Sequence, residues 1–449
     1  MQNLQSKIAI IGAGLAGLTI AYRLKQKGYN VALYEARSRV GGRIHSVYIQ
    51  NTEGGISVAE LGGQNINDGG DAKNILDLAK EFGIEVVHDN LNFTSLYHDG
   101  ETYHDTKSIL SRIPNCLDLF KEMHRLSPLY KNMREVLDQL FPTDSKLNRL
   151  CSFFLNSYEG SPPELLSSYH NCEILEMMIS WFYDGLYRND INKPTRIFFK
   201  NGTASLALKI AEKLNDDLHL SMPLETLCSN SNNTIDLVFK GGSHATCEQL
   251  IFAIPCSVFN DIKIDKQILE LAHQEKLKKI QYGSNAKILY PISYGPTTHS
   301  MILTDKVASF FNGDKCLTNL YFINDDGDSK LVDQDLGKFL PIIKNGYANC
   351  QFTNQPPVEP LEEQYTFYTA PVAKSWIKDP FSRGSYSGYG IYINEELDKK
   401  TKVSGIEFKK LFAPINNQVF FAGEHATILP EIGTMEAAVE SAERLANLF

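Results

Sequence analysis

The sequence predicts an α/β protein in which a domain of alternating strands and helices is interleaved with a second, α+β domain. Three observations support this. Residues 7–43 follow the order strand, glycine-rich turn, helix, strand. Residues from about 96 to 198 have a mostly helical pattern that prolines interrupt, and strand-like segments dominate from about 286 to 375. A chain of 449 residues is also long enough for more than one domain.

The first element is a short apolar run, Ile8 to Ile11, which is typical of a buried parallel strand. Apolar residues then recur at helical spacing from Leu15, and Gly28 ends this helix. A second strand, Val31 to Tyr34, is followed directly by the acid Glu35. This order of strand, glycine turn, helix, strand and acid indicates a Rossmann-like unit that binds a dinucleotide.

The glycines of this unit form a G-x-G-x-x-G motif. Gly12 allows the tight turn, Gly14 lets a pyrophosphate approach the backbone, and Gly17 lets helix and strand pack closely. The helix N-terminus offers free N–H groups to the phosphates, and Glu35 is placed to accept hydrogen bonds from a ribose. A chance glycine loop is the alternative, and the complete strand–helix–strand context argues against it. The predicted binding residues here are Gly12, Ala13, Gly14, Leu15, Ala16, Gly17, Glu35, Ala36 and Arg37.

Three further motifs narrow the cofactor. They are Arg39-Val40-Gly41-Gly42-Arg43, Glu60-Leu61-Gly62-Gly63, and the segment Val419–Phe449 with its Ala-Gly-Glu turn. Each resembles a motif of the flavin-containing amine oxidases, which are FAD enzymes. The resemblance is strongest at the two ends of the chain. It implies that the first and last segments meet at one FAD, with the closing helix pointing its N-terminus at the flavin.

The same resemblance implies further residues at the cofactor. They are Gly42, Arg43, Gly62, Gly63, Gln64, Asn65, Leu224, Trp376, Gly423, Glu424, Thr434 and Met435. Ser385 stands where some members of the family carry the cysteine that bonds covalently to the flavin. Serine cannot form that thioether, so we expect non-covalent FAD.

The pattern along the chain divides it into five alternating segments. Residues 1–95, 199–285 and 376–449 are predicted to form the Rossmann-like FAD-binding domain. Residues 96–198 supply the helical part of the substrate domain, and residues 286–375 supply its β part. Helices are expected at Ile109–Leu119, Cys172–Leu186 and from Asn201 to Leu214. Strands are expected at Leu218–Leu227, Thr234–Phe239, Leu250–Pro255, Ala286–Tyr290, Met301–Thr304 and Leu317–Ile323.

Lys287 is the first candidate catalytic residue. It alternates with Ile288 along a predicted strand, and a solvent-facing lysine is the ordinary interpretation of that pattern. The resembling family has a lysine in a similar segment, where it holds a water against flavin N5. The resemblance therefore implies that Lys287 orients this water during hydride transfer and during the reaction with oxygen.

Tyr386 and Trp376 are the next candidates. Two core aromatics are the ordinary interpretation. Their spacing resembles that of the tryptophan and the cage tyrosine of monoamine oxidases, where the tyrosine flanks the substrate amine in front of the flavin. An electron-rich ring suits a nitrogen that arrives as a cation.

Two positions depart from related enzymes. Thr434 replaces the second cage tyrosine of monoamine oxidases, so we expect a wider pocket; threonine can also cap the closing helix. Asn65 lies where L-amino-acid oxidases often place an arginine for the substrate carboxylate. Arg188 or Arg196 could substitute for that arginine. His425, beside the Ala-Gly-Glu turn, is interpreted as a structural or cofactor-proximal residue.

Composition sets limits on partners. A net charge of −9 argues against nucleic acid. No run of 18 apolar residues exists, so no membrane span is expected. The eight cysteines are scattered without metal-ligand spacing, which favours reduced thiols, a cytoplasmic location and no metal site.

The combined prediction is an FAD-dependent amine oxidase that converts an amine to an imine and reduces O2 to hydrogen peroxide. An L-amino-acid oxidase, a desaturase or isomerase of a non-amine substrate, and a flavin-binding protein without turnover are the alternatives. Lys287 and Tyr386 argue against the last of these. The sequence makes no prediction of the particular amine or of the oligomeric state.

Overall fold

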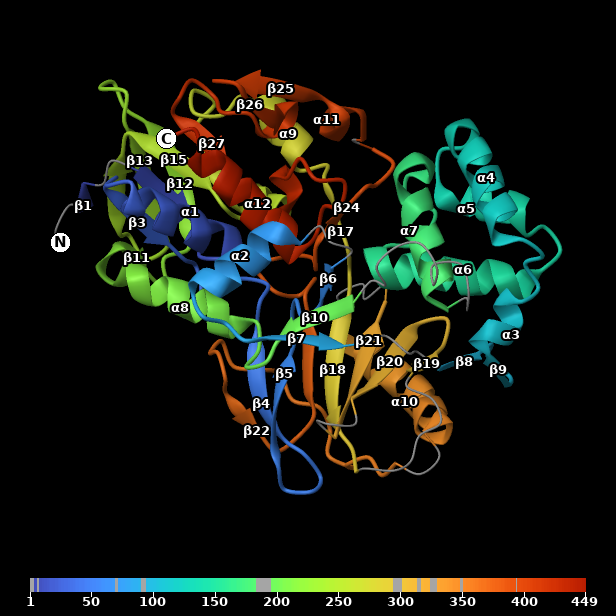
Figure 1. Cartoon of the computed structure of the whole chain (residues 1–449). Coiled ribbons are helices and arrows are strands. Elements are labelled where there is room, and N and C mark those ends of the chain that lie inside the picture. The colour runs from blue at the N-terminus through green and yellow to red at the C-terminus, as the bar shows by residue number, and fades with distance from the viewer. Residues whose placement is uncertain are drawn as a thin grey trace.

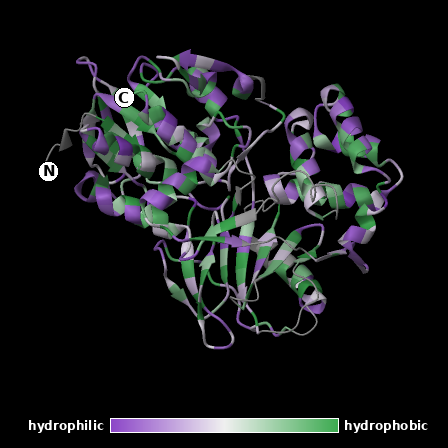
Figure 2. Cartoon of the chain, in the orientation of Figure 1, coloured by the Kyte–Doolittle hydropathy of each residue, from purple (hydrophilic) through white to green (hydrophobic). Residues whose placement is uncertain are grey.

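The computed structural model describes residues 4–5, 8–68, 72–89, 94–182, 195–293, 301–312, 316–323, 329–347, 350–392 and 394–449. Figure 1 shows a lobe that contains both ends of the chain, a layer of strands below it and a group of helices at the side. The helices alternate between green and purple in Figure 2, as expected for helices that bury one face.

A parallel five-stranded sheet forms the centre of the first lobe. Its strands, in spatial order, are β11 (Leu218–His219), β3 (Val31–Tyr34), β2 (Ile8–Ile11), β15 (Gln249–Phe252) and β27 (Val419–Phe421). Strands from both ends of the chain are thus separated only by β15, which pairs with β2 on one side and with β27 on the other. The sheet therefore brings the first and last segments together.

Helices cover one face of this sheet. They are α1 (Leu15–Gln26), α2 (Lys73–Glu81), α8 (Ala204–Leu214) and α12 (Met435–Ala446). The helices α1 and α12 lie side by side, and their apolar residues share one core with β2 and β3.

A second core lies on the other face of the parallel sheet. It packs against a mixed sheet with the order β1 (Leu4–Gln5), β14 (His244–Cys247), β13 (Ile235–Phe239), β12 (Leu224–Ser229) and β16 (Lys263–Ile264). The parallel sheet is therefore buried on both faces, which explains its nearly continuous apolar strands.

The largest sheet has seven strands. Their order is β23 (Val372–Ser375), β18 (Ala286–Pro291), β21 (Leu317–Phe322), β20 (Val307–Asn312), β19 (Met301–Leu303), β8 (Ser95–His98) and β9 (Tyr103–Asp105). Helix α10 (Ser329–Gly346) packs on one face, against Ile288, Tyr290 and Leu320. On the opposite face, Met301 and Leu303 pack against the helical group, and Leu289 and Leu317 pack against Val47 and Ile49.

The helical group comprises α3 (Thr106–Leu110), α4 (Cys116–Leu126), α5 (Met133–Leu140), α6 (Ser145–Glu159) and α7 (Ser168–Phe182). Asn115, Asn132 and Asp144 accept backbone hydrogen bonds as N-caps of α4, α5 and α6. Gly160 ends α6 in the left-handed conformation, with φ of 66°. The apolar core of this group includes Met301, Leu303 and Ala308 of the seven-stranded sheet.

Smaller elements complete the fold. Two of them are three-stranded sheets, one with β4 (Ser46–Gln50), β5 (Ile56–Glu60) and β22 (Phe367–Tyr368), the other with β6 (Ile66–Asp68), β10 (Thr195–Phe199) and β7 (Val86–Asp89). Two are strand pairs, β17 (Gln281–Tyr282) with β24 (Ser387–Gly388) and β25 (Lys400–Val403) with β26 (Ile406–Lys409). The remaining elements are the helices α9 (Leu271–Leu277) and α11 (Asn394–Asp398).

Most predicted elements are confirmed, and three differ. The predicted helix Ile109–Leu119 is two helices, α3 and α4, because Pro114 interrupts it. The predicted strand Leu218–Leu227 is divided between two sheets as β11 and β12, with Ser221 at φ of 57° and Pro223 between them. The third difference is α10, which lies in a region predicted to consist of strands.

Helix α7 begins at Ser168, four residues before its predicted start, and is described to Phe182. The predicted remainder, 183–186, lies outside the described residues. The α/β fold class is confirmed. We keep the five-segment domain division as a proposal, which the two main sheets support, although β8 and β9 join the substrate sheet from the boundary near residue 95.

Candidate active site

A single cavity of about 830 Å³ extends between the parallel sheet, the seven-stranded sheet and the helical group. Every residue predicted at the cofactor lines it except Ala13 and Gly17, which lie directly behind the lining. The three predicted catalytic residues, Lys287, Tyr386 and Thr434, line it too. The structure thus brings together residues from the beginning, the middle and the end of the chain.

The first glycine loop has the geometry that the sequence predicts. Gly12 adopts φ of +100°, where side chains are rare, and its N–H donates to Tyr34 O at 2.7 Å. A Cβ on Gly17 would lie 1.8 Å from Gly12 O, so only glycine allows this helix–strand contact. A Cβ on Gly14 would meet nothing within 4 Å, which leaves open space beside the backbone for a ligand.

Glu35 is buried at the edge of this loop. Its two carboxylate oxygens accept hydrogen bonds from the N–H groups of Ala13, at 2.7 Å, and Arg37, at 2.9 Å. Each oxygen keeps a lone pair for a further donor. Glu35 can therefore hold the loop and still accept a ribose hydroxyl.

Arg37 belongs to a buried ion-pair cluster that sequence reasoning missed. Its guanidinium pairs with Asp379 and donates to Ser382 Oγ at 2.9 Å. Lys374 Nζ lies 2.7 Å from the same Asp379 carboxylate. Burial alone would raise the pKa of Asp379, but Arg37 and Lys374 outweigh it and lower this pKa. The cluster fixes the loop before Tyr386 against the nucleotide-binding lobe.

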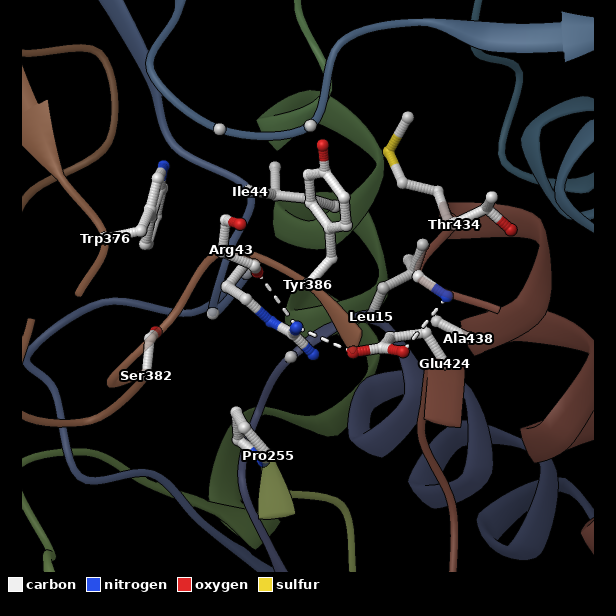
Figure 3. A pocket seen from close by; sticks show the side chains of 18 of the residues that line it. Leu15, Arg43, Ile44, Pro255, Trp376, Ser382, Tyr386, Glu424, Thr434 and Ala438 are labelled. Carbon is white, nitrogen blue, oxygen red and sulfur yellow. Dashed lines mark hydrogen bonds and ion pairs between the residues drawn. The ribbon is translucent and has the colours of Figure 1, made fainter. Parts of the chain in front are cut away.

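Arg43 and Glu424 form a second ion pair, 2.7 Å between Nη1 and Oε1 (Figure 3). Arg43 also donates to Ser385 O at 3.0 Å, and Glu424 accepts from Gly433 N at 3.1 Å. Burial would raise the pKa of Glu424, but the charge of Arg43 outweighs it, so the pKa is lowered and the carboxylate stays ionised. This pair connects the second glycine loop, the Tyr386 segment and the turn before α12.

Lys287 is buried, so the solvent-facing interpretation is wrong. Its Nζ donates to Glu60 O at 2.9 Å and to Gly62 O at 3.1 Å. Burial lowers its pKa to about 8, and the Glu60 carboxylate partly offsets this effect. An ammonium has three donors, so one N–H remains for a water or a ligand in the cavity.

Trp376 and Tyr386 both line the cavity (Figure 3). Trp376 Nε1 donates to Leu61 O at 3.0 Å. The hydroxyl of Tyr386 contacts Tyr158 O, Asn285 Nδ2 at 3.0 Å and Tyr321 OH at 3.1 Å. Burial raises the pKa of Tyr386 well above its usual value, so this phenol stays neutral.

Sequence reasoning missed Tyr158, Asn285 and Tyr321. Their contacts with Tyr386 span 65 to 228 positions, and no local pattern reports them.

Thr434 caps α12, as predicted: its Oγ1 accepts from Ala437 N at 3.0 Å. Met435 follows and packs against Gly63, where an added Cβ would lie 3.3 Å from its sulfur. Asn65 and Gln64 line the same region. Arg188 and Arg196 are the two arginines that could replace an arginine at Asn65 as partner of a substrate carboxylate. Arg188 lies outside the described residues, and so does the side chain of Arg196.

At the opposite end the cavity is lined by Leu224, as predicted, together with Met222 and Pro223.

His425 is buried at the cavity wall, with Nδ1 3.4 Å from Tyr282 OH, and burial lowers its pKa to about 4. It is therefore neutral at pH 7, in agreement with a cofactor-proximal role without charge.

Comparison with known proteins identifies the family. The sequence model described as "Flavin containing amine oxidoreductase" matches residues 15–290. The chain belongs to this family. It is 23% identical to amine oxidase [flavin-containing] A of Equus caballus, over 98% of this chain and 84% of that protein. It is 21% identical to probable polyamine oxidase 4 of Arabidopsis thaliana, over 95% and 83% of the two chains.

Solved structures of this fold include a putrescine oxidase and a cyclohexylamine oxidase from Brevibacterium oxydans. The first is 18% identical over 99% of both chains, with a TM-score of 0.71. The second is 16% identical over 99% and 98%, with a TM-score of 0.70. Membership of the family confirms the expected fold class, the FAD cofactor and the class of enzyme, an FAD-dependent amine oxidoreductase.

The described residues fit FAD. The first N–H groups of α1 have no partner within the helix, and they face the open space beside Gly14. A Cβ on Gly42 would lie 3.2 Å from Gly14 Cα, so the two glycine loops approach each other at the same place. No helix in the described part of the chain is long and apolar enough to cross a bilayer.

Proposed function

We propose that the protein oxidises an amine that lacks an α-carboxylate, with O2 as the electron acceptor. The observation that carries this proposal is that Lys287 and Trp376 donate to the backbone of Leu61–Gly62 in the cavity that Tyr386 also lines. The structural neighbours named putrescine oxidase and cyclohexylamine oxidase support amine chemistry in this fold.

The reaction balances as follows. The carbon beside the nitrogen loses a hydride and the nitrogen loses a proton, which gives an imine. Two electrons and two protons convert O2 to H2O2, and water hydrolyses the imine to a carbonyl compound and ammonia or a smaller amine. When bound, FAD supplies the two-electron relay between the C–H bond and O2. Every other contribution comes from the chain's own side chains and backbone.

Binding of the cofactor falls to the glycine loops, the start of α1, Glu35 and the Arg43–Glu424 pair. The N-terminus of α12, capped by Thr434, adds a partial positive charge that favours a neighbouring negative charge. Lys287 holds a water with its remaining N–H, because Glu60 O and Gly62 O occupy the other two. Tyr386 presents a ring that three polar contacts of its hydroxyl keep in one orientation, which favours a positioning role.

The substrate class follows from the arginines of the described cavity lining. There are three: Arg37 is paired with Asp379, Arg43 with Glu424, and Arg383 with Asp261 at 2.6 Å. None offers an unpaired guanidinium to a substrate carboxylate, and burial of an unpaired carboxylate is costly. Asn65 and Thr434 support the same conclusion, because they supply neither a cation nor a second cage ring.

A cytoplasmic location remains part of this proposal, on the evidence of the scattered cysteines.

The test is a matched pair, an amino acid and the amine formed by its decarboxylation, compared by kcat/KM for peroxide release at one pH. The amine should be preferred by at least about tenfold, or about 1.4 kcal/mol. A preference for the amino acid would contradict the proposal and would favour an L-amino-acid oxidase with its arginine at Arg188 or Arg196. Flavin reduction by neither compound would favour a desaturase or isomerase of a non-amine substrate.

A further inference from the structure

The side chain of Asn285 binds two tyrosine hydroxyl groups in the cavity wall. Asn285 is 1% exposed and directly precedes β18. Its Nδ2 donates to Tyr321 OH at 2.5 Å and to Tyr386 OH at 3.0 Å. Both tyrosines line the cavity, whereas Asn285 is not among its described lining residues. Asn285 therefore acts on a ligand through the two rings and not by contact.

The hydrogen atoms of this cluster can be assigned in one way. Tyr386 gives its single hydroxyl hydrogen to Tyr158 O, a carbonyl that can only accept. The Tyr386 oxygen then accepts from Asn285 and, at 3.1 Å, from the hydroxyl of Tyr321. Burial raises the pKa of Tyr321 to about 12 and that of Tyr386 well above its usual value, so both phenols keep these hydrogens at pH 7.

The opposite orientation of the Asn285 amide is incompatible with these contacts. Its Oδ1 would then face both hydroxyls, and Tyr386 has no second hydrogen to give it. Two of the four contacts in the cluster would join a pair of acceptors, whichever way the Tyr321 hydroxyl turned. The orientation with Nδ2 toward the phenols satisfies all four, and it leaves the buried Oδ1 without a donor among the described residues.

The backbone around Asn285 fixes the position of its amide. A Cβ on Gly160 would lie 2.5 Å from Asn285 Nδ2, so the glycine that ends α6 leaves the space that the amide fills. Asn285 O accepts from Trp376 N at 3.3 Å. Asn285 also lies two positions before Lys287, so in an extended chain the two side chains point to the same face. One buried amide thus connects the strand of Lys287, the backbone of Trp376 and the ring of Tyr386.

We propose that Asn285 is a positioning residue for amine oxidation, whose two N–H groups set the places of the Tyr386 and Tyr321 rings in the cavity wall. The Tyr386 hydroxyl has its hydrogen and both acceptor positions occupied, so a substrate meets the ring and not a free hydroxyl. Attraction of a cation to a ring face depends on a close, well-placed contact. Displaced rings therefore bind or align the amine less well. This inference deepens the proposed function and rests on it for the reaction.

A double-mutant cycle tests whether Asn285 acts through Tyr386. Asn285→Ala and Tyr386→Phe should each lower kcat/KM for peroxide release by at least about threefold, and the double variant should be no slower than the slower single variant. The substrate is the amine of the matched pair. A double-variant loss equal to the product of the two single losses would overturn the proposal, because independent structural losses multiply. A wild-type kcat/KM in Asn285→Ala would overturn it too.

Two further variants separate the hydrogen bonds from packing. Asn285→Asp keeps the shape of the side chain but has no N–H, so it should lose as much kcat/KM as Asn285→Ala. Wild-type kinetics in Asn285→Asp would assign Asn285 a packing role. Asn171 is the matched control, since it is also 1% exposed and its Nδ2 donates to Ser167 O and Tyr389 O. Asn171→Ala should lower Tm and leave kcat/KM unchanged; the same kinetic loss and coupling to Tyr386 would contradict the specific role of Asn285.

The pH dependence of kcat/KM tests the assignment of the hydrogens. The Tyr386 hydroxyl exchanges no proton with the substrate if its hydrogen bonds are all within the chain. Tyr386→Phe should therefore show the same ionisations in its pH profile as the wild-type enzyme, at a lower rate. Loss of one ionisation in this variant would show that the hydroxyl reacts with the substrate, and it would overturn the proposed positioning.

The inference and the proposed function can fail separately. The probe is 2-amino-2-methylhexane, which has no hydrogen on the carbon beside its nitrogen and cannot be oxidised. It is titrated into the FAD-loaded protein and followed by flavin absorbance, and its Kd should show the same non-additive cycle. If no amine binds or is oxidised, the proposed function fails. The cycle is then measured by the visible circular dichroism of the bound flavin, where the double variant should match Tyr386→Phe; independent changes would overturn the role of Asn285.

Discussion

The guanidinium of Arg43 lies 2.7 Å from the carboxylate of Glu424, and this ion pair joins two glycine-containing motifs that are 381 positions apart. Ser387 and Gly433 bind the same carboxylate, so four segments meet at one buried charge pair. The pair lies where the two predicted halves of the cofactor site come together. It therefore links the integrity of the fold to the retention of FAD.

Arg43→Met should remove the ion pair between residue 43 and Glu424. The substitution leaves the Glu424 carboxylate buried without its cation, which typically costs about 3–5 kcal/mol. We expect a fall in Tm and a lower FAD content after gel filtration, measured from flavin absorbance. Arg125→Met is the control, because its pair with Glu122 is exposed to solvent and should contribute little to stability. An unchanged Tm for Arg43→Met would show that the pair does not stabilise the fold.

The same pair predicts a pH dependence of stability. The pKa of Glu424 is lower in the folded protein than its ordinary value of 4.5, because the charge of Arg43 outweighs burial. Its contribution is therefore fully present above about pH 4.5 and is lost as the pH falls through the lower, folded-state pKa. The stability difference between wild type and Glu424→Gln, measured by urea unfolding, should be constant from pH 6 to 8 and should shrink below about pH 4.5.

Ser385 predicts non-covalent FAD. Its Oγ is buried close to Gly283, where an added Cβ would lie 2.6 Å away, and it has no sulfur to bond to the flavin. Acid precipitation should therefore leave FAD in the supernatant, measured by absorbance and fluorescence. Flavin that remains in the washed pellet would contradict the interpretation of Ser385. Glu35→Ala should in addition speed the loss of FAD during dialysis, because it removes the acceptor for the ribose.

Lys287→Met tests the predicted catalytic lysine. Methionine keeps the length of the side chain but removes the donors that hold Glu60 O, Gly62 O and a water. We expect anaerobic reduction, reoxidation by O2, or both, to slow at least roughly tenfold in stopped-flow measurements, while FAD content stays constant. Lys263→Met, in the exposed part of another strand, is the matched control. Wild-type rates in both half-reactions would show that Lys287 has only a structural role.

The local motifs explain how much of the site the sequence predicts. Gly12, Gly17 and Glu35 act within one strand–turn–helix–strand unit, so their roles follow from spacing alone. Asp379, Tyr321 and Asn285 act on residues 36 to 342 positions away, and no short pattern reports such contacts. Helix α10 was missed for a different reason: it contains Gly337 and Pro341, which disfavour helix, and packing on the seven-stranded sheet overrides them.

Thr434→Tyr tests the width of the pocket. A ring at this position would face the cavity opposite Tyr386 and fill the space that threonine leaves (Figure 3). We expect the ratio of kcat/KM for a bulky secondary amine to that for a small primary amine to fall by roughly tenfold. Tyrosine also removes the N-cap of α12, which costs about 1 kcal/mol, so Thr434→Ala must be measured beside it. The alanine variant loses the same cap but not the space, and it should lower Tm without changing the ratio. If both variants shift the ratio equally, the cap and not the missing ring sets the choice of substrate.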